Sequence, residues 1–170
     1  EPFSNFIANK SGDIEVLVLD DSAEVRIGNV DRAILHEDRI YVLDWMQRRL
    51  VCYDSYTGAF IRQIGRFGRA GDEYLQITNF DVDANGDIWI IDSQSDHLFK
   101  FAPDGHFLFR KNMPFKALDI KVLSKDSLLF ALAPINPAKY NKCRLLRCDE
   151  NLHHSTLFLP YDDDIDKACL

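Results

Sequence analysis

One motif, a short apolar run that ends in aspartate, occurs twice near the middle of the chain. The run Ile40-Tyr-Val-Leu-Asp44 returns about 48 residues later as Ile88-Trp-Ile-Ile-Asp92, and a looser third copy lies between residues 128 and 149. Repeats with a period of roughly 40 to 50 residues are typical of solenoids, propellers and arrays. This periodicity constrains the fold more strongly than any other feature of the sequence.

Each copy of the repeat has the pattern of four short strands joined by turns. In the middle copy, Asn85-Gly86 supplies two positions that tolerate positive φ in a tight hairpin, and Pro103-Asp-Gly105 marks a second turn. The strands expected in the first and middle copies are 30–35, 40–43, 50–53 and 60–64, then 77–82, 88–91, 98–101 and 107–109. Four-stranded antiparallel meanders of this length are the blades of a β-propeller. The predicted fold class is therefore all-β.

We expect residues 1–170 to form a single β-propeller domain or a half-propeller. The blades are expected at approximately 30–65, 77–111 and 117–159. The third blade has a long loop, 134–142, between its second and third strands, and such loops often lie on a binding face. Residues 14–19 are rich in Val and Leu and fall outside the three blades, so they are a candidate strand to close the final blade.

Two passages of the sequence resemble NHL-type repeats. The first is the glycine-rich stretch Ile64–Tyr74, and the second runs from Phe80 to Gly105. The turn Tyr53–Phe60 and the end of the glycine-rich stretch are similar to bacterial six-bladed β-propeller proteins of that group. The resemblance spans residues 25–159 and implies a partial six-bladed propeller. It also implies a scaffold that is commonly exported or lipid-anchored in bacteria and has no shared catalytic residues.

Two features depart from that resemblance. The third repeat lacks the glycine-rich connector and has Leu132 where the other two have aspartate. The chain also holds about three blades where the family has six, so the end sheets of the stack would expose apolar faces. We therefore expect a partner, which is either the missing blades of a longer ring or, less favoured, a second copy related by a twofold axis.

Composition and charge argue against several partners. The 170 residues are 46% hydrophobic and 28% charged, with a formal charge of −7 and scattered basic residues, so we expect no nucleic-acid partner. No apolar run approaches the ~20 residues that span a bilayer. The sequence shows neither a starting Met nor a signal-like segment, which fits a trimmed sequence or a mature exported chain. The resemblance favours an exported, periplasmic or cell-surface location, with lipid anchoring before processing left open.

The four cysteines, Cys52, Cys143, Cys148 and Cys169, have spacings that match neither a zinc ribbon nor a redox motif. Cys148 follows Cys143 by five positions. Because alternate residues of a strand point to opposite faces, the two side chains would lie on opposite faces of one strand and could not form a disulfide. We expect free, mostly buried thiols.

The segment Asp81–Ile88 contains the acidic spacing that opens an EF-hand calcium loop. Its flanks are expected strands instead of helices, and an extended strand after Asp87 would place Asp92 more than ~12 Å away, too far to close the site. Trp89 also occupies the position where a shorter hairpin site needs a carboxylate. The weak metal candidates are Asp81, Asp83 and Asn85. We predict that Asp81 and Asp83 bind no calcium tightly, and we expect no cofactor.

Glycines recur at Gly65, Gly68 and Gly71, and glycine-rich backbone can cradle phosphate. Phosphate-binding loops continue directly into a helix, whereas the residues after Gly71 have the pattern of a strand. The stretch is better explained as the connector between the first two blades. Its charged side chains could line a ring face, and they are the predicted ligand-binding residues: Arg66, Arg69, Asp72 and Glu73.

Asp44 with Arg49 and Asp92 with His97 bracket the same four-residue turn in two repeats. Active sites are rarely duplicated in each blade, so a turn clamp explains these pairs better than catalysis does. The histidines are dispersed, and the sequence contains no nucleophile elbow. We therefore assign no catalytic residue.

The leading hypothesis is a non-enzymatic binding or scaffold propeller whose ring face recognises a peptide, glycan or protein partner. The alternative is a propeller hydrolase or lyase that uses carboxylates on its inner strands, and fold analogy alone does not decide between them. The acids available for that role are Asp31, Asp81, Asp83 and Asp119. If these acids lie within hydrogen-bond reach of one another, the hydrolase or lyase is favoured. If they lie apart at the ends of separate strands, the binding propeller is favoured.

Overall fold

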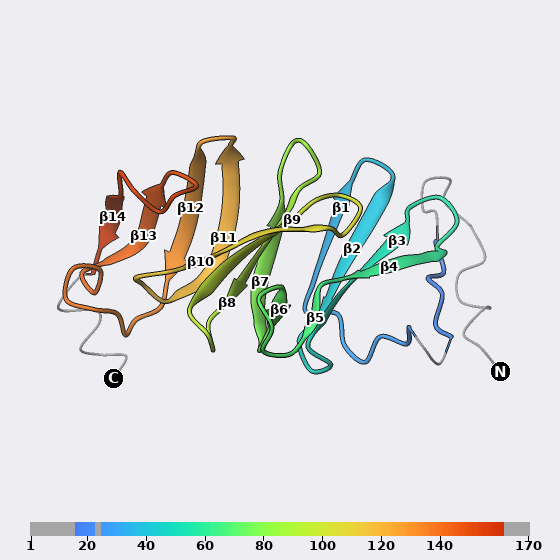
Figure 1. Ribbon diagram of the computed structural model, residues 1–170. Helices are drawn as coiled ribbons and strands as arrows, with labels where there is room; N and C mark the ends of the chain where they lie inside the picture. Colours follow the sequence, from blue (N-terminus) through green and yellow to red (C-terminus); the bar gives the residue numbers. More distant parts are fainter. Residues whose placement is uncertain (1–15, 23–24, 162–170) are drawn as a thin grey trace.

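The structure is a computed structural model that describes residues 16–22 and 25–161. These residues form fourteen strands, and no helix among them is long and apolar enough to cross a membrane. Three antiparallel sheets have four strands each, and β5 (Arg66–Phe67) and β6 (Glu73–Tyr74) form a short parallel pair (Figure 1).

The strands of each sheet follow one another in chain order. The first sheet contains β1 (Arg32–His36), β2 (Arg39–Asp44), β3 (Arg49–Asp54) and β4 (Phe60–Ile64). The second contains β7 (Ile77–Val82), β8 (Ile88–Asp92), β9 (His97–Phe101) and β10 (Phe107–Asn112). The third contains β11 (Ala117–Ser124), β12 (Ser127–Leu132), β13 (Cys143–Cys148) and β14 (Thr156–Pro160).

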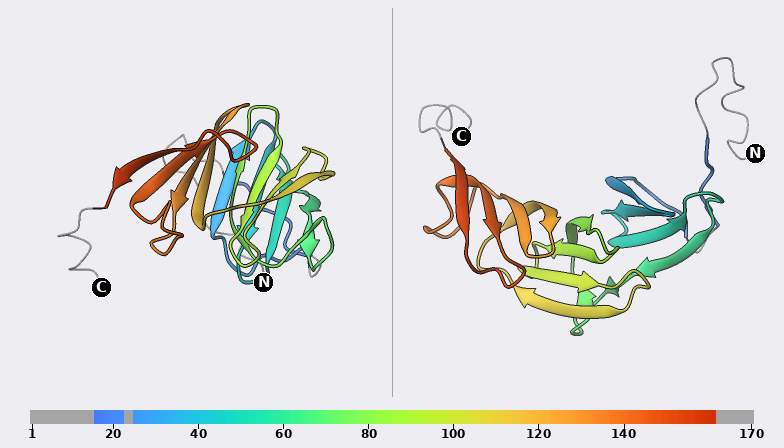
Figure 2. Two further views of the ribbon diagram at one scale, coloured as in Figure 1. Left: turned by 60° about the vertical axis from the view of Figure 1, so that its left-hand side comes forward. Right: turned by 90° about the horizontal axis from the view of Figure 1, so that it is seen from above.

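The predicted fold class is confirmed for the described residues, because they are all-β and their sheets have the four-stranded antiparallel form of propeller blades. Figure 2 shows the three sheets side by side along an arc. β7 contacts β1 on one side and β11 on the other, so the first strand of each sheet lies on the inner side of the arc.

The hairpin between β7 and β8 differs from the expected two-residue turn. Gly86 has a positive φ of 82°, whereas Asn85 does not. The N–H of Gly86 donates to the Asp83 carbonyl, and the N–H of Asp83 donates to the Asp87 carbonyl. The prediction of two positive-φ residues was wrong, because a three-residue loop reverses the chain with one glycine in the left-handed region.

Two apolar layers hold the sheets together. Between the first and second sheets, the buried aromatic residues are Tyr41, Tyr74, Phe80, Phe99 and Phe101. Between the second and third sheets they are Trp89, Phe115, Phe130 and Tyr140. Fully burying one large apolar side chain contributes about 1.5–3 kcal/mol, so these layers supply most of the attraction between blades. β8 is buried along both faces because its sheet has a neighbour on each side.

The outer face of the first sheet is covered by the leading segment, defined as residues 16–22 and 25–31. Its Leu19 and Ile27 pack against buried residues of β2 and β3, namely Val42, Val51 and Tyr53. The Tyr53 hydroxyl also donates to the Val25 carbonyl at 3.2 Å. The candidate closing strand, 14–19, lies partly outside the described residues, and residues 16–19 are not assigned to a strand.

Two buried aspartates hold equivalent turns in the first and second sheets. Asp44 accepts hydrogen bonds from the N–H groups of Gln47 at 2.9 Å and Gly28 at 2.7 Å. Asp92 accepts from Ser95 at 3.1 Å and Leu75 at 2.7 Å. The interpretation of Asp44 and Asp92 as turn clamps is confirmed, because each carboxylate ties its turn to the backbone that leads into the same sheet. These hydrogen bonds come from backbone N–H groups, so the expected pairing of the two aspartates with Arg49 and His97 stays a prediction.

The third sheet lacks such an aspartate, and Asn136 of the long loop takes its place. Asn136 Oδ1 accepts from the N–H of Lys116 at 2.7 Å, and its Nδ2 donates to the carbonyls of Lys116 at 3.0 Å and Ala133 at 2.7 Å. Tyr140 of the same loop is buried against Phe115. The loop is therefore anchored at two points.

Candidate functional site

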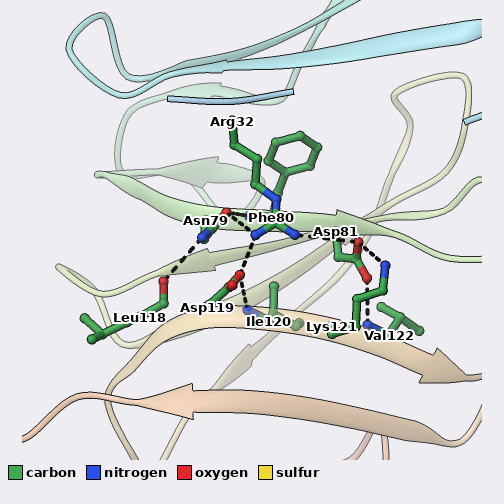
Figure 3. Close-up of polar contacts among 9 residues, drawn as sticks. All are labelled: Arg32, Asn79, Phe80, Asp81, Leu118, Asp119, Ile120, Lys121 and Val122. Carbon is green, nitrogen blue, oxygen red and sulfur yellow. Dashed lines mark hydrogen bonds and ion pairs between the residues drawn. The ribbon is translucent and has the colours of Figure 1, made fainter. Parts of the chain in front are cut away.

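A polar network crosses the inner side of the arc and joins the first strands of all three sheets (Figure 3). Arg32 of β1 donates through Nη1 to Asn79 Oδ1 of β7 at 3.0 Å and to Asp119 Oδ1 of β11 at 2.6 Å. Its guanidinium carbon lies 5.9 Å from the centre of the Phe80 ring. A single side chain thus connects three strands that are far apart in the sequence.

Asp81 of β7 is the fully buried carboxylate of this network. It accepts hydrogen bonds from Lys121 Nζ at 2.9 Å and from the N–H of Val122 at 2.7 Å. Arg32 Nη2 lies 4.0 Å from Asp81 Oδ1. A buried carboxylate is tolerated when it is paired and hydrogen-bonded, and two cations with a backbone donor meet that need here. The two acids of the network, Asp81 and Asp119, are therefore balanced by two basic side chains.

Only two of the four inner-strand acids come together. Asp31 precedes β1 and accepts from the N–H of Trp45 at 2.7 Å, and Asp83 follows β7 in the hairpin. The expectation that Asp31 and Asp83 lie on inner strands was wrong, because both residues fall just outside the strands and hold turns. Asp81 and Asp119 do converge, but through Arg32 and not as a free carboxylate pair.

Asp83 organises the hairpin between β7 and β8. Its Oδ1 accepts from the N–H groups of Asn85 at 2.9 Å and Asp87 at 3.1 Å, and its Oδ2 accepts from Trp89 Nε1 at 2.9 Å. Within the part of the chain that the structure describes, no group of three or more His, Cys, Asp or Glu side chains is placed to hold a metal. The absence of tight calcium binding stays a prediction, and the occupied oxygens of Asp83 are consistent with it.

The connector between the first and second sheets carries the four predicted ligand-binding residues. Glu73 accepts from the N–H of Ala70 at 2.9 Å and from Arg66 Nε at 2.7 Å, and these two donors hold the pKa of Glu73 below its usual range. Glu73 therefore keeps the connector in shape. The Arg66 side chain is 68% exposed, and Arg69 and Asp72 are exposed as well.

A wide depression of about 800 Å³ lies between the connector and the turn that joins β9 to β10. Arg66 and Asp72 line it together with His106 and Phe107, and the buried Phe101 lies beneath. The structure thus brings two of the four predicted ligand residues to one concave surface. Arg69 and Glu73 are not among its lining residues.

The sequence interpretation missed a group of exposed apolar side chains next to the connector. Trp45 and Met46, in the turn between β2 and β3, are 50% and 73% exposed, and Phe67 of β5 is 53% exposed. The Arg48 guanidinium carbon lies 4.9 Å from the centre of the Phe67 ring, so the turn and β5 lie side by side at the lower edge of Figure 1. The one available signal was the presence of large apolar residues at turn positions.

Solved structures with similar folds include propeller proteins. A protein of Bacteroides fragilis named "Putative exported protein" matches with a TM-score of 0.78 and 21% identity, over 88% of this chain and 43% of that one. The β-propeller domain of Cps50 (Swd1) from Myceliophteria thermophila matches with a TM-score of 0.55 and 12% identity, over 85% and 43%. A member of the DUF4221 family from Bacteroides vulgatus matches with a TM-score of 0.56 and 8% identity, over 76% and 42%.

At these identities the likeness shows the fold alone, and this chain spans less than half the length of each of those structures. No curated protein matches the sequence. The family described as a domain of unknown function, DUF4934, matches residues 7–168. The chain therefore belongs to the DUF4934 family.

Proposed function

We propose that this protein is a non-enzymatic binding propeller whose ring face recognises a peptide, glycan or protein partner. The observation that carries the proposal is that the two acids on the inner strands, Asp81 and Asp119, are already engaged in hydrogen bonds. Asp81 is occupied by Lys121 and the N–H of Val122, and Asp119 is occupied by Arg32. General acid–base catalysis needs a side chain that exchanges a proton with the substrate, whereas these carboxylates are engaged in contacts between blades.

The surface beside the connector supports a binding role. Ligand sites are usually concave and combine apolar walls with a few polar groups, as the depression near Arg66 and Asp72 does with Phe107. The predicted ligand residues keep distinct roles in this proposal. Arg66, Arg69 and Asp72 are the candidates for direct contact, and Glu73 positions Arg66.

The finer family assignment is also a proposal: the three sheets are blades of a six-bladed ring of NHL type, completed by further blades or by a second copy. Support comes from the repeated sheet architecture and the resemblance of the connector sequence to such repeats. We further propose an exported, periplasmic or cell-surface location. The name of the similar Bacteroides fragilis protein supports that location.

Glycan and peptide arrays probed with the intact protein test the binding role. We expect a ligand whose affinity falls about tenfold or more in the double variant Arg66→Ala with Asp72→Ala, equivalent to about 1.4 kcal/mol. Lys125→Ala, an exposed change in the turn between β11 and β12, is the control and should leave affinity within about twofold. Turnover of an array compound that is lost in Asp119→Asn would contradict the proposal and favour the hydrolase or lyase alternative.

A further inference from the structure

The turns that follow β2 and β8 have the same backbone conformation and hydrogen bonding but carry different side chains. The clamps by Asp44 and Asp92 are equivalent, and Arg48 and Asp96 have the same positive φ of 55°. The first residue of each turn is also held alike: the N–H of Trp45 donates to Asp31, and the N–H of Ser93 donates to Thr78 Oγ1.

The side chains of the two turns differ in polarity and charge. Trp45, Met46 and Arg48 in the first turn correspond to Ser93, Gln94 and Asp96 in the second. Because small and polar residues maintain the same turn, the fold does not require tryptophan and methionine in solvent. Exposed apolar groups that a fold does not require mark interaction sites, and Trp, Phe, Met and Arg are enriched in protein interfaces.

Four exposed side chains of this turn and of β5 make up what we call the Trp45 patch: Trp45, Met46, Arg48 and Phe67. The Trp45 carbonyl accepts from Gln76 Nε2 at 3.1 Å and from the N–H of Arg48 at 3.2 Å, so the turn is tied both to itself and to the connector. Arg48 covers the Phe67 ring. A patch whose backbone is already fixed loses little conformational freedom on binding, which favours affinity.

The charges around the patch indicate what it would select. Arg48, Arg66 and Arg69 lie in this turn and connector. Among the acids beside them, Glu73 is engaged by Arg66, Asp31 accepts from the N–H of Trp45, and Asp72 is exposed. The chain as a whole has a formal charge of −7, so this region, where three arginines lie beside three acids, is less acidic than the protein as a whole. The turns at the opposite edge are mostly acidic: Glu37, Asp38, Asp83, Asp87 and Asp126. Complementary charge steers and orients a partner, so an acidic segment fits this edge and not the other.

We propose that the Trp45 patch binds an acidic protein segment, with a large apolar side chain of the segment on Trp45, Met46 and Phe67 and its carboxylates facing the arginines. This inference rests on the proposed binding function and names its partner class. A central apolar and aromatic contact with charged groups at its rim is the usual arrangement of a binding hot spot.

Selection of phage-displayed peptides on the intact protein tests the inference. The counter-selection uses the double variant Trp45→Ser with Met46→Gln, which copies the second turn and so keeps a sequence that this turn conformation accepts. We expect enriched peptides with an aromatic or aliphatic residue beside Asp or Glu. Synthetic copies should bind about tenfold or more weakly to the double variant and to Arg48→Asp, and should lose affinity as salt rises. Tyr56→Ser, at a different turn and 80% exposed, is the control and should leave the affinity unchanged.

The outcomes separate the two proposals. Enriched peptides without acidic residues, or peptides that bind the double variant equally well, would overturn this inference and leave the binding role intact. Neutral glycans that need Trp45, with no acidic peptide selected, would overturn it as well. An intact protein that binds neither peptides nor glycans would contradict both proposals. Unfolding midpoints of each variant, measured in parallel, distinguish lost binding from lost folding.

Discussion

The outer faces of the first and third sheets lie at opposite ends of the stack, and they differ in what covers them. Val42 and Val51 of the first sheet are each 1% exposed because Leu19 and Ile27 of the leading segment pack on that face. On the third sheet, Leu146 packs toward the second sheet, so its strand neighbour Leu145 lies on the outer face with its register partner Phe158. Phe158 is 41% exposed, and in Figure 2 no described segment lies over that face.

The difference shows that the outer face of a sheet can be buried by a segment that is not itself a sheet. The leading segment, which carries no assigned strand at 16–22, buries the outer valines of the first sheet as fully as a neighbouring sheet buries its own contact face. The third sheet presents apolar residues to solvent instead. We therefore expect the outer face of the third sheet to be where a further sheet packs, from a longer chain or from a second copy.

The largest expected effect is that of Val25→Asp, a change that breaks the cover of the first sheet. Val25 is 6% exposed, and its carbonyl accepts the Tyr53 hydroxyl. An unpaired carboxylate at such a position should lower the free energy of unfolding by about 3 kcal/mol or more, measured by urea denaturation. Val30→Asp, at a position 58% exposed, is the control and should change it by less than about 0.5 kcal/mol. Equal small losses would mean that the segment does not cover the face in solution.

A matched pair of truncations compares the two faces directly. Val51→Ala on the covered face should lower the free energy of unfolding by about 1.5–3 kcal/mol, because the valine is fully buried. Phe158→Ala on the open face should lower it by less than about 1 kcal/mol, although phenylalanine is the larger side chain. Urea denaturation of both variants at one protein concentration gives the comparison. A Phe158→Ala loss as large as that of Val51→Ala would show that the open face is covered in solution.

Self-association of the 170-residue chain should depend on the open face. Light scattering is expected to give an apparent mass above 19.6 kDa that rises with concentration, because exposed apolar faces associate. Leu145→Lys combined with Phe158→Lys should return the mass toward that of a monomer. Leu35→Lys, at an exposed position of β1, should leave the association unchanged. A stable, well-dispersed wild-type monomer with cooperative unfolding would contradict this expectation.

Thiol labelling reports which face each cysteine occupies. Cys143 lies on the open side of β13 and is half-buried, whereas Cys148 lies in the apolar layer between the second and third sheets. Burial raises the pKa of Cys148 to about 12 and raises that of Cys52 as well. Since the thiolate is the reactive form, iodoacetamide at pH 8 should modify Cys143 about tenfold or more faster than Cys148. Peptide mapping by mass spectrometry separates these sites from Cys169, and equal rates at Cys143 and Cys148 would contradict the assignment of faces.

The smallest expected effect concerns the middle of the stack, where the hairpin between β7 and β8 is closed by its own hydrogen bonds. Calcium should produce no heat beyond dilution in isothermal titration, since Asp83 already accepts from Asn85, Asp87 and Trp89. Asp83→Ala is the matched variant. A stoichiometric micromolar site that disappears in this variant would show the prediction to be wrong.

The local architecture was determined by the sequence alone. Alternating apolar runs and turn residues predicted three four-stranded meanders, because the hydrogen bonds of a meander join segments that are adjacent in the chain. The positions of the turn clamps, Asp44 and Asp92, were also predicted from the sequence, because their donors Gln47 and Ser95 lie three residues away. The sequence paired them with Arg49 and His97 instead and did not predict the more distant donors Gly28 and Leu75. The hairpin at Gly86 was placed correctly, although its loop length was not.

Contacts between sheets were decided only by the tertiary structure. Arg32 reaches Asp119 across 87 positions and Asn79 across 47, and no local pattern pairs them. Asn136 replaces the missing aspartate of the third repeat from within an inserted loop, and the turn after β2 meets β5 where Arg48 covers Phe67. Such pairs depend on how one finished sheet stacks on the next. The residues of the inner network and of the Trp45 patch therefore become neighbours only after the blades have formed and packed.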